Sequence, residues 1–332
     1  MIDGPQSMRE IIYLNQSHLD SLDLNLSCIV DVLEDVFRHK AAGDTVMPPK
    51  IFFHLQEDRF YSAMASCCPP LGYAGSKWQS GDPANPSRGL PYIQGLFILN
   101  ENETGQMVAI IDARWITGKR TAAAFALVAR YQAKKGSEVL ALLGCGVQGR
   151  THLEALAAEV PSLKLCQVFD IVPERQAAYI EEMDGRFHGV QVIGANGAKS
   201  TVKGADIVIS GGPIQTERNA TIVSEWIKPG ALIITIDYDS YVTDECIAAM
   251  DIVLTDDYEQ IQDAREREGK FLGVTQIDAD NAEMIAHGKG RRRNNQQRIL
   301  AFNLGIALED VATAAEILRR ASEKGIGIRL AP

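Results

Sequence analysis

Three glycines in the segment LLGCGVQGRTHL, residues 142–153, have the spacing of a dinucleotide-binding turn. In such a turn Gly144 allows the sharp bend, Gly146 lets a pyrophosphate approach the backbone, and Gly149 lets a helix pack closely on a strand. The first N–H groups of that helix would face the phosphates. A glycine pattern alone is weak evidence, so the prediction needs support from residues elsewhere in the chain.

An acidic residue follows at the expected place. Asp170 comes directly after the apolar run 164–169, about 20 residues beyond the glycines. A carboxylate there accepts hydrogen bonds from the ribose hydroxyls and repels a 2′-phosphate, which favours NAD over NADP. Arg175 lies close by and keeps NADP open as the less favoured cofactor. Ser210 and Gly211, which end a later apolar run, are candidates to contact the nicotinamide ribose.

The composition limits the classes of protein to which the chain can belong. The chain has 332 residues, enough for two domains, and a formal net charge of −10 that argues against nucleic acid or an anionic membrane as partner. The basic run 291–293 is predicted to be a solvated loop or a subunit contact. Six cysteines without metal-ligand spacing, and no apolar stretch of about 20 residues, predict a soluble cytoplasmic protein with reduced thiols and no metal site.

The centre of the chain alternates short apolar runs with helix-like segments. The runs lie at 138–143, 164–169, 190–193, 205–210, 231–236 and 251–255, and the helical segments at 148–159, 173–184 and 197–203. Unbroken apolar runs are typical of strands buried on both faces of a parallel sheet. This pattern predicts an α/β fold of the doubly wound Rossmann type.

The two ends of the chain have a different pattern. We expect a helix over 22–39, an irregular Pro/Gly-rich stretch over 47–91, an antiparallel hairpin from 92–99 and 107–111, and a helix starting at Thr117. The stretch 296–320 is predicted to be helical, to follow the last strand of the sheet and to return to the first domain. The expected domains are therefore an α+β substrate-binding and dimerisation domain (1–116 with 300–332) and an NAD-binding Rossmann domain (117–299).

Several longer segments resemble the ornithine cyclodeaminase/mu-crystallin family. They are GSKWQSGDPAN (75–85), TGQMVAIIDARWITGKRTAAA (104–124), LLGCGVQGRTHLEAL (142–156), KPG with TIDYDS (228–240) and NLGIALED (303–310). The resemblance implies an NAD(P)-dependent enzyme, expected as a homodimer, that acts on α-amino or α-imino acids. It also leaves open a non-catalytic binding protein, because one branch of the family binds hormone and cofactor.

The resemblance implies roles for several charged residues. Lys77 and Arg120 match the family's cations for the substrate carboxylate, and Lys50 is the nearest candidate for a third, with Arg59 as the alternative. Arg120 is also expected at a helix start, where the dipole disfavours a cation and a binding role would explain it. Asp239 matches the catalytic aspartate, with Lys77 as a second catalytic residue.

Further cofactor contacts are implied at Thr121, Val147, Gln148 and Asp239 itself. Asp237 is expected on the same side of the strand as Asp239, as a second carboxylate. Ser62 stands where the ornithine-cyclising members have an acidic residue for the distal amine, so an amino-acid dehydrogenase or imine reductase is favoured over a cyclodeaminase that recycles NAD.

Overall fold

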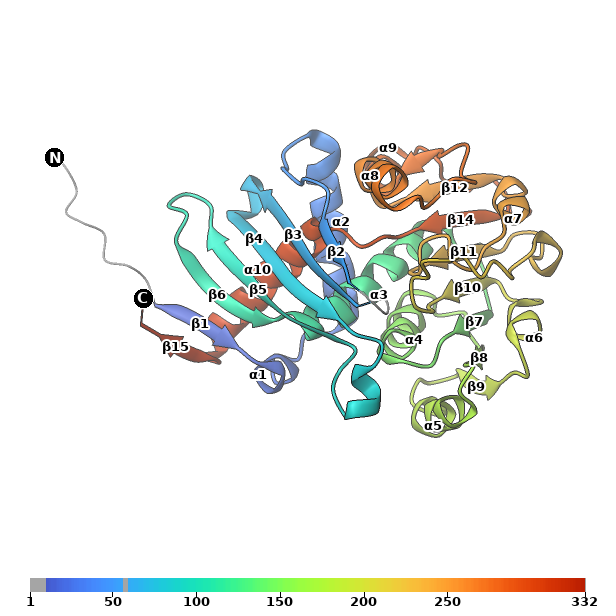
Figure 1. Cartoon of the computed structure of the whole chain (residues 1–332), viewed down its shortest axis with the longest axis horizontal. Coiled ribbons are helices and arrows are strands. Elements are labelled where there is room, and N and C mark those ends of the chain that lie inside the picture. Colours follow the sequence, from blue (N-terminus) through green and yellow to red (C-terminus); the bar gives the residue numbers. More distant parts are fainter. Residues whose placement is uncertain (1–9, 56–58, 332) are drawn as a thin grey trace. The chain divides into compact units, whose positions relative to one another are not determined.

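The computed structural model describes residues 10–55 and 59–331, which form two compact units (Figure 1). The terminal unit comprises the chain up to Arg120 together with the chain from Ile306 onward, and the central unit comprises Thr121–Gly305. Each unit is built around one β-sheet. In the described part of the chain, no helix is long and apolar enough to span a bilayer.

The central unit contains an all-parallel sheet with the strand order β13-β12-β14-β11-β10-β7-β8-β9. Its strands are β7 (Val139–Leu143), β8 (Leu165–Phe169), β9 (Gln191–Gly194), β10 (Ile207–Ser210), β11 (Leu232–Thr235), β12 (Ile252–Thr255), β13 (Ala279–Asp280) and β14 (Ile299–Phe302). Every residue of β10, β11, β12 and β14 is buried, as expected for central strands with both faces covered. The Rossmann-type fold and its six predicted strands are confirmed.

The helices of the central unit connect these strands. They are α4 (Val147–Glu159), α5 (Pro173–Met183), α6 (Ala198–Val202), α7 (Asp244–Ala248), α8 (Tyr258–Glu268) and α9 (Asn281–His287), with a 3₁₀ turn at Ser224–Trp226. The first three confirm the predicted helices. One prediction was wrong: β14 lies inside the stretch 296–320, which was expected to be helical throughout. Its sequence, ILAF, fits a buried strand or a buried helix equally, and the pairing with β11 and β12 decides the outcome.

Helix α3 (Ala113–Gln132) begins in the terminal unit and ends in the central unit. It starts before Thr117, so Arg120 lies about two turns inside the helix and not at its start. The predicted position of Arg120 at a helix start is therefore wrong, and the helix dipole does not disfavour a cation there, because that effect is confined to the first turn.

The terminal unit contains a mixed sheet with the order β15-β1-β6-β5-β4-β3-β2, formed from both ends of the chain. Its strands are β1 (Ile11–Leu14), β2 (Ile51–His54), β3 (Phe60–Cys68), β4 (Tyr73–Gly81), β5 (Ile93–Glu101), β6 (Met107–Asp112) and β15 (Ile328–Leu330), with 3₁₀ turns at Pro69–Leu71 and Asn85–Arg88. Among the strands that the structure describes in this sheet, only β1 and β6 pair in parallel. The predicted hairpin is confirmed as β5 and β6.

The stretch 47–91 was expected to be irregular. This prediction is wrong, because the stretch contains β2, β3 and β4. The apolar alternation that would have revealed β3 and β4 is interrupted on their buried face. That face carries Ser62, Ser66, Lys77 and Gln79 beside the apolar Met64 and Cys68, all of them buried. A buried sheet face that is partly polar gives only a weak hydrophobic signal of period two.

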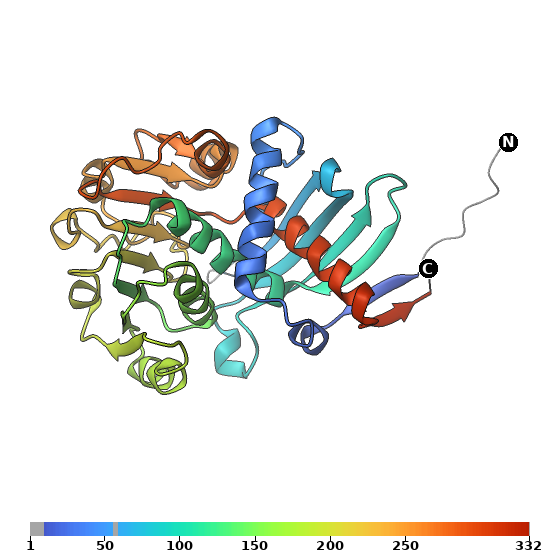
Figure 2. The same ribbon diagram turned by 180° about the vertical axis from the view of Figure 1, so that it is seen from behind.

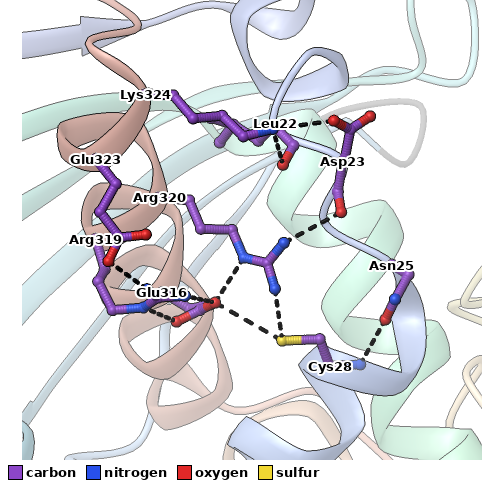
Figure 3. Close-up of polar contacts among 9 residues, drawn as sticks. All are labelled: Leu22, Asp23, Asn25, Cys28, Glu316, Arg319, Arg320, Glu323 and Lys324. Carbon is purple, nitrogen blue, oxygen red and sulfur yellow. Dashed lines mark hydrogen bonds and ion pairs between the residues drawn. The ribbon is translucent and has the colours of Figure 1, made fainter.

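Helix α10 (Ala307–Lys324) lies over β3, β4 and β5 and packs on α2 (Leu26–Ala42), and the short α1 (Gln16–Asp20) precedes α2 (Figure 2). Asn25 caps α2 through the Cys28 N–H, and Gly43 ends it with a φ of 79°. Arg320 of α10 donates to Glu316 Oε1, Asp23 O and Cys28 Sγ, at 2.7, 3.1 and 3.1 Å (Figure 3). These contacts fix α10, whose first turn carries charged residues of the candidate site.

The basic run 291–293 is not simply a solvated loop. Arg291 Nε donates to Met284 O at the end of α9, and Arg292 Nε donates to Gln132 O at the end of α3. Both guanidiniums satisfy carbonyl groups at helix ends, which gives these two residues a structural role.

Candidate functional site

The turn between β7 and α4 requires two of its three glycines for steric reasons. Gly144 has a φ of +110°, and a Cβ there would lie 2.7 Å from Gly211 O. A Cβ on Gly149 would lie 2.4 Å from Gly144 O. By contrast, a Cβ on Gly146 would meet nothing within 4 Å. Gly144 and Gly149 therefore hold the turn together, and Gly146 borders open space.

That open space lies at the start of α4. Gly146 is the N-cap of the helix, and no side chain in the described ranges caps it. The N–H groups of the first turn, with the helix dipole behind them, are suited to bind an anion. Val147, the first residue of the helix, is exposed, and Gln148 follows it. The residues present therefore fit a dinucleotide pyrophosphate.

Asp170 lies directly after β8, where it also holds the glycine turn. Its Oδ2 accepts the Cys145 N–H at 2.9 Å, and its Oδ1 accepts the Val172 N–H at 2.9 Å. A carboxylate has about four lone-pair sites, so both oxygens keep capacity for ribose hydroxyls. Asp170 therefore orients the turn whether or not it also contacts a ribose.

Ser210 and Gly211 follow β10 beside the same turn. Gly211 N donates to Leu143 O at 2.9 Å, and Ser210 Oγ donates to Asp237 Oδ2 at 2.6 Å. Gly212 N donates to the same oxygen at 3.0 Å. Burial raises the pKa of the Asp237 carboxyl to about 7, although these two hydrogen bonds act in the opposite direction.

Asp237 and Asp239 were expected on the same side of a strand. This prediction is wrong, because β11 ends at Thr235, before both residues. Tyr238 between them has a φ of +60°, in the left-handed region. This reversal directs the two carboxylates to different partners. Asp237 binds Ser210, and Asp239 Oδ2 accepts the Phe271 N–H at 2.8 Å.

Asp239 is buried, and among the described residues only one of its carboxylate oxygens accepts a hydrogen bond. Arg218 Nε lies 3.4 Å from Asp239 Oδ2 and donates to the Asp239 carbonyl at 3.0 Å. Within residues 10–55 and 59–331, nothing donates a hydrogen bond to Asp239 Oδ1. Phe271 and Arg218 were missed from the sequence because nothing local links them to Asp239. The geometry suits a carboxylate held by one oxygen and available for proton transfer at the other.

Lys77 belongs to a buried cluster in the terminal unit. Its side chain is fully buried, and Nζ lies 2.8 Å from Asp310 Oδ2 and 3.3 Å from Thr117 Oγ1. Burial lowers the pKa of Lys77 to about 8, against the opposing effect of Asp310. Lys50 also lowers the pKa of Lys77 through its charge, so it lies within electrostatic range of this cluster.

Arg120 extends the same cluster from α3. Its Nε lies 3.0 Å from Asp310 Oδ1, and its Nη1 lies 2.7 Å from Glu309 Oε2. Burial raises the pKa of the Glu309 carboxyl, and Arg120 opposes this. Lys77 and Arg120, predicted together as carboxylate ligands, are thus brought together by one acidic pair in the first turn of α10. That pair was visible in NLGIALED as adjacent acids at the start of an apolar helix.

The remaining predicted residues lie along helices α3 and α4 of the central unit. Thr121 follows Arg120 on α3 and is buried. The Gln148 carbonyl lies 2.7 Å from His152 Nδ1, and the His152 ring packs edge-on against Phe125. Burial lowers the pKa of His152 to about 4. His152 is therefore a packing residue.

The protein is an α/β protein of two units, one with an all-parallel Rossmann-like sheet and one with a mixed sheet. The glycine turn and the two sets of buried charges fit the Rossmann-like oxidoreductase fold. The chain belongs to the ornithine cyclodeaminase/mu-crystallin family, whose family model matches residues 14–325.

Relatives agree in length and fold. The chain is 29% identical over 328 residues to an alanine dehydrogenase of Archaeoglobus fulgidus, covering 97% of this chain and 98% of the relative. The Thermococcus litoralis Delta(1)-pyrroline-2-carboxylate reductase, solved with NADH and L-proline, superposes with a TM-score of 0.87 at 26% identity, covering 96% of this chain and 100% of that one. An archaeal alanine dehydrogenase dimer with bound NAD gives 0.86 at 28% identity, covering 97% and 99%.

Proposed function

We propose that this protein is an NAD-dependent oxidoreductase for α-amino or α-imino acids, working as an amino-acid dehydrogenase or imine reductase. The observation that carries the proposal is the Asp239 carboxylate, anchored at Oδ2 and without a hydrogen bond at Oδ1 from any described residue. Relatives with bound NAD or NADH and with the same fold support the choice of cofactor. When bound, NAD would accept or donate the hydride at the substrate Cα.

The chain's own residues then have distinct tasks. Lys77 and Arg120 bind the substrate carboxylate, with Lys50 as an additional charge nearby. Asp239 Oδ1 takes a proton from the substrate ammonium, which frees the nitrogen lone pair, and returns it in the opposite direction. When NAD is bound, the α4 N-terminus would hold the pyrophosphate and Asp170 the ribose, and Thr121, Ser210 and Gly211 would be further cofactor contacts.

Replacing Asp239 with Asn tests this assignment. We expect D239N to lose turnover by 100-fold or more, roughly the contribution of a general base. NADH binding, measured by fluorescence titration, should stay within about 3-fold of the native value, because Asn preserves the shape of the side chain. The matched control is D244N, since Asp244 also pairs with Arg218, at 2.6 Å, but is exposed. Native-like turnover in D239N would contradict the mechanism.

The same assay separates the alternatives. A dehydrogenase or reductase changes NADH stoichiometrically with substrate, whereas a cyclodeaminase releases ammonia without net NADH. The missing acidic residue at Ser62 favours the former. A protein that binds amino acids and NADH but turns over neither amino acids nor 2-oxo acids with ammonia would instead be a cofactor-dependent binding protein.

We further propose that the protein is a homodimer, as the archaeal alanine dehydrogenase relative is. The face of β2 to β5 opposite α10 presents a row of exposed apolar side chains. These residues, called the apolar sheet face below, are Phe53, Tyr61, Trp78, Leu96 and Ile98.

A further inference from the structure

The buried face of β3 and β4 contains polar groups that the mechanism above does not use. Ser62 and Gln79 are directly opposite each other in the antiparallel pair. Lys77 lies two residues from Gln79 on the same strand and therefore on the same face. Ser62 has no exposed surface, and Gln79 is 9% exposed. An uncharged polar pair thus lies beside the cation that we assign to the substrate carboxylate.

One oxygen atom of each of these side chains lacks a hydrogen-bond partner in the described part of the chain. Among the residues that the structure describes, nothing bonds to Ser62 Oγ or to Gln79 Oε1. The Gln79 amide nitrogen has only a weak contact, at 4.0 Å, with Met64 Sδ. A buried polar atom without a partner costs about 1–3 kcal/mol. Such atoms are rare in folded proteins, and an unfilled pair at a candidate site indicates a ligand that completes it.

The surrounding charges limit what that ligand can carry. The nearby cations Lys77 and Arg120 are already paired with Asp310 and Glu309. Within the described ranges, no carboxylate bonds to Ser62 or Gln79, so a cationic side chain would be buried without a counter-charge. A second anionic group would have to share Lys77 and Arg120 with the substrate carboxylate. A hydroxyl or amide matches a serine hydroxyl and a glutamine amide without a charge penalty.

We propose that Ser62 and Gln79 form a specificity subsite for an uncharged hydrogen-bonding side chain, so that the substrate is a hydroxyl- or amide-bearing α-amino acid or its imine. This inference rests on the proposed function for the position of the substrate carboxylate. The hydroxyl of Ser62 and the amide of Gln79 each exchange a hydrogen bond with the substrate side chain.

The test compares near-isosteric amino acids that differ in polarity: threonine with valine, serine with 2-aminobutyrate, and asparagine with leucine. We expect native protein to reduce NAD⁺ with the polar member of at least one pair at a kcat/KM roughly 10-fold or more above its apolar partner. In Ser62→Ala combined with Gln79→Leu the preference should disappear. The loss should be in KM more than in kcat, because these groups bind and take no part in the chemistry.

A matched control changes the same residue types on the opposite face of the sheet. Ser80 adjoins Gln79 in β4 and pairs with Gln94 of β5, and both side chains point away from α10. Ser80→Ala with Gln94→Leu should keep the native preference. A merely structural role for Ser62 and Gln79 would lower the melting temperature of their double variant. We expect the melting temperature to stay level or rise, because two unpaired buried oxygens are removed. Ser62→Ala alone is the fallback if the double variant does not fold.

Binding provides a readout that does not depend on turnover. The rise in melting temperature caused by saturating threonine should exceed that caused by valine in native protein, and the two should be equal in the double variant. Native preference for the apolar member of every pair, by kinetics and by melting temperature, would overturn the subsite while leaving the oxidoreductase intact. Unchanged preference in the double variant would show that only water fills the position, which also overturns it. Absence of turnover with a preserved threonine shift would instead contradict the oxidoreductase and retain the subsite.

Discussion

At the scale of single residues, the charge on Lys77 makes substrate binding depend on pH. Burial lowers its pKa from 10.5 to about 8, so Lys77 is protonated below about pH 8 and becomes neutral above it. A carboxylate ligand therefore loses one of its cations as pH rises through 8, while Arg120 stays charged. We expect the inhibition constant of a 2-hydroxy acid, which has no amine to titrate, to weaken roughly 10-fold between pH 7 and 9.5, the contribution of one charge-assisted hydrogen bond.

The control for this pH dependence is Lys77→Arg. Arginine keeps its charge throughout this range, so the inhibition constant of the variant should stay flat even if its absolute value is poorer. An inhibition constant in the native protein that does not change between pH 7 and 9.5 would contradict the role of Lys77.

Residue types in short motifs were predictable, but their partners were not. GSKW and GKRT identified Lys77 and Arg120, and IDYDS identified Asp239, because each motif is local. The acids that hold the two cations, Glu309 and Asp310, lie about 190 residues from Arg120, and only folding brings them together. The same holds for the Phe271 N–H that anchors Asp239. Backbone reversal at Tyr238 was also hidden, since a bulky residue rarely adopts a positive φ.

At the scale of elements, the β7–α4 turn contains glycines with different roles: Gly149 is required by packing, and Gly146 borders the proposed cofactor site. In Gly149→Ala the new methyl would lie 2.4 Å from the Gly144 carbonyl oxygen, which is backbone and cannot move aside cheaply. We expect this variant to unfold at a temperature several degrees lower, since a clash of this kind costs about 1–3 kcal/mol. In Gly146→Ala the methyl meets no protein atom within 4 Å, so the melting temperature of the protein without cofactor should be unchanged.

Cofactor affinity should show the reverse pattern: Gly146→Ala, which leaves the melting temperature unchanged, should weaken NADH binding. A methyl on Gly146 projects into the space where the pyrophosphate approaches the backbone, so we expect NADH to bind at least 10-fold more weakly by fluorescence titration. Equal NADH affinity in Gly146→Ala and native protein would show that the pyrophosphate lies elsewhere.

The sequence pattern predicted the elements whose buried positions are apolar, and it missed elements whose buried positions are partly polar. Six of the eight strands described in the central unit, β7 to β12, are mostly apolar, and the predicted runs lie within one or two residues of their ends. Strands β3 and β4 were missed because the polar side chains Ser62, Lys77 and Gln79 interrupt the apolar pattern of their buried face. An element that departs from the hydrophobic pattern is therefore where a functional site is expected. β14 was missed for another reason, because four apolar residues do not by themselves distinguish a strand from a helix.

At the scale of the whole molecule, the two faces of the terminal sheet differ in exposure. The face under α10 is buried and combines the polar residues of β3 and β4 with apolar ones such as Met64 and Phe97, whereas no helix in the described part of the terminal unit packs over the apolar sheet face. Tyr61 and Trp78 stack there with ring centroids 5.7 Å apart, and Phe53 packs edge-on against Trp78 at 6.3 Å. Contiguous exposed aromatic side chains are typical of protein interfaces. Their charge-free surface fits a second copy of the same chain better than a charged ligand.

Replacing Trp78, which is 51% exposed, with Glu tests the dimer. Loss of a central aromatic side chain costs about 2 kcal/mol or more, roughly a 30-fold weaker association, and a carboxylate facing its own copy adds repulsion. We therefore expect W78E to sediment as a monomer at concentrations where the native protein is a dimer. Circular dichroism should be unchanged, because the side chain points away from α10. Ile171→Glu, at an exposed apolar position of the central unit, is the control and should remain dimeric. A native protein that sediments as a monomer, or a W78E variant that stays dimeric, would exclude this face as the interface.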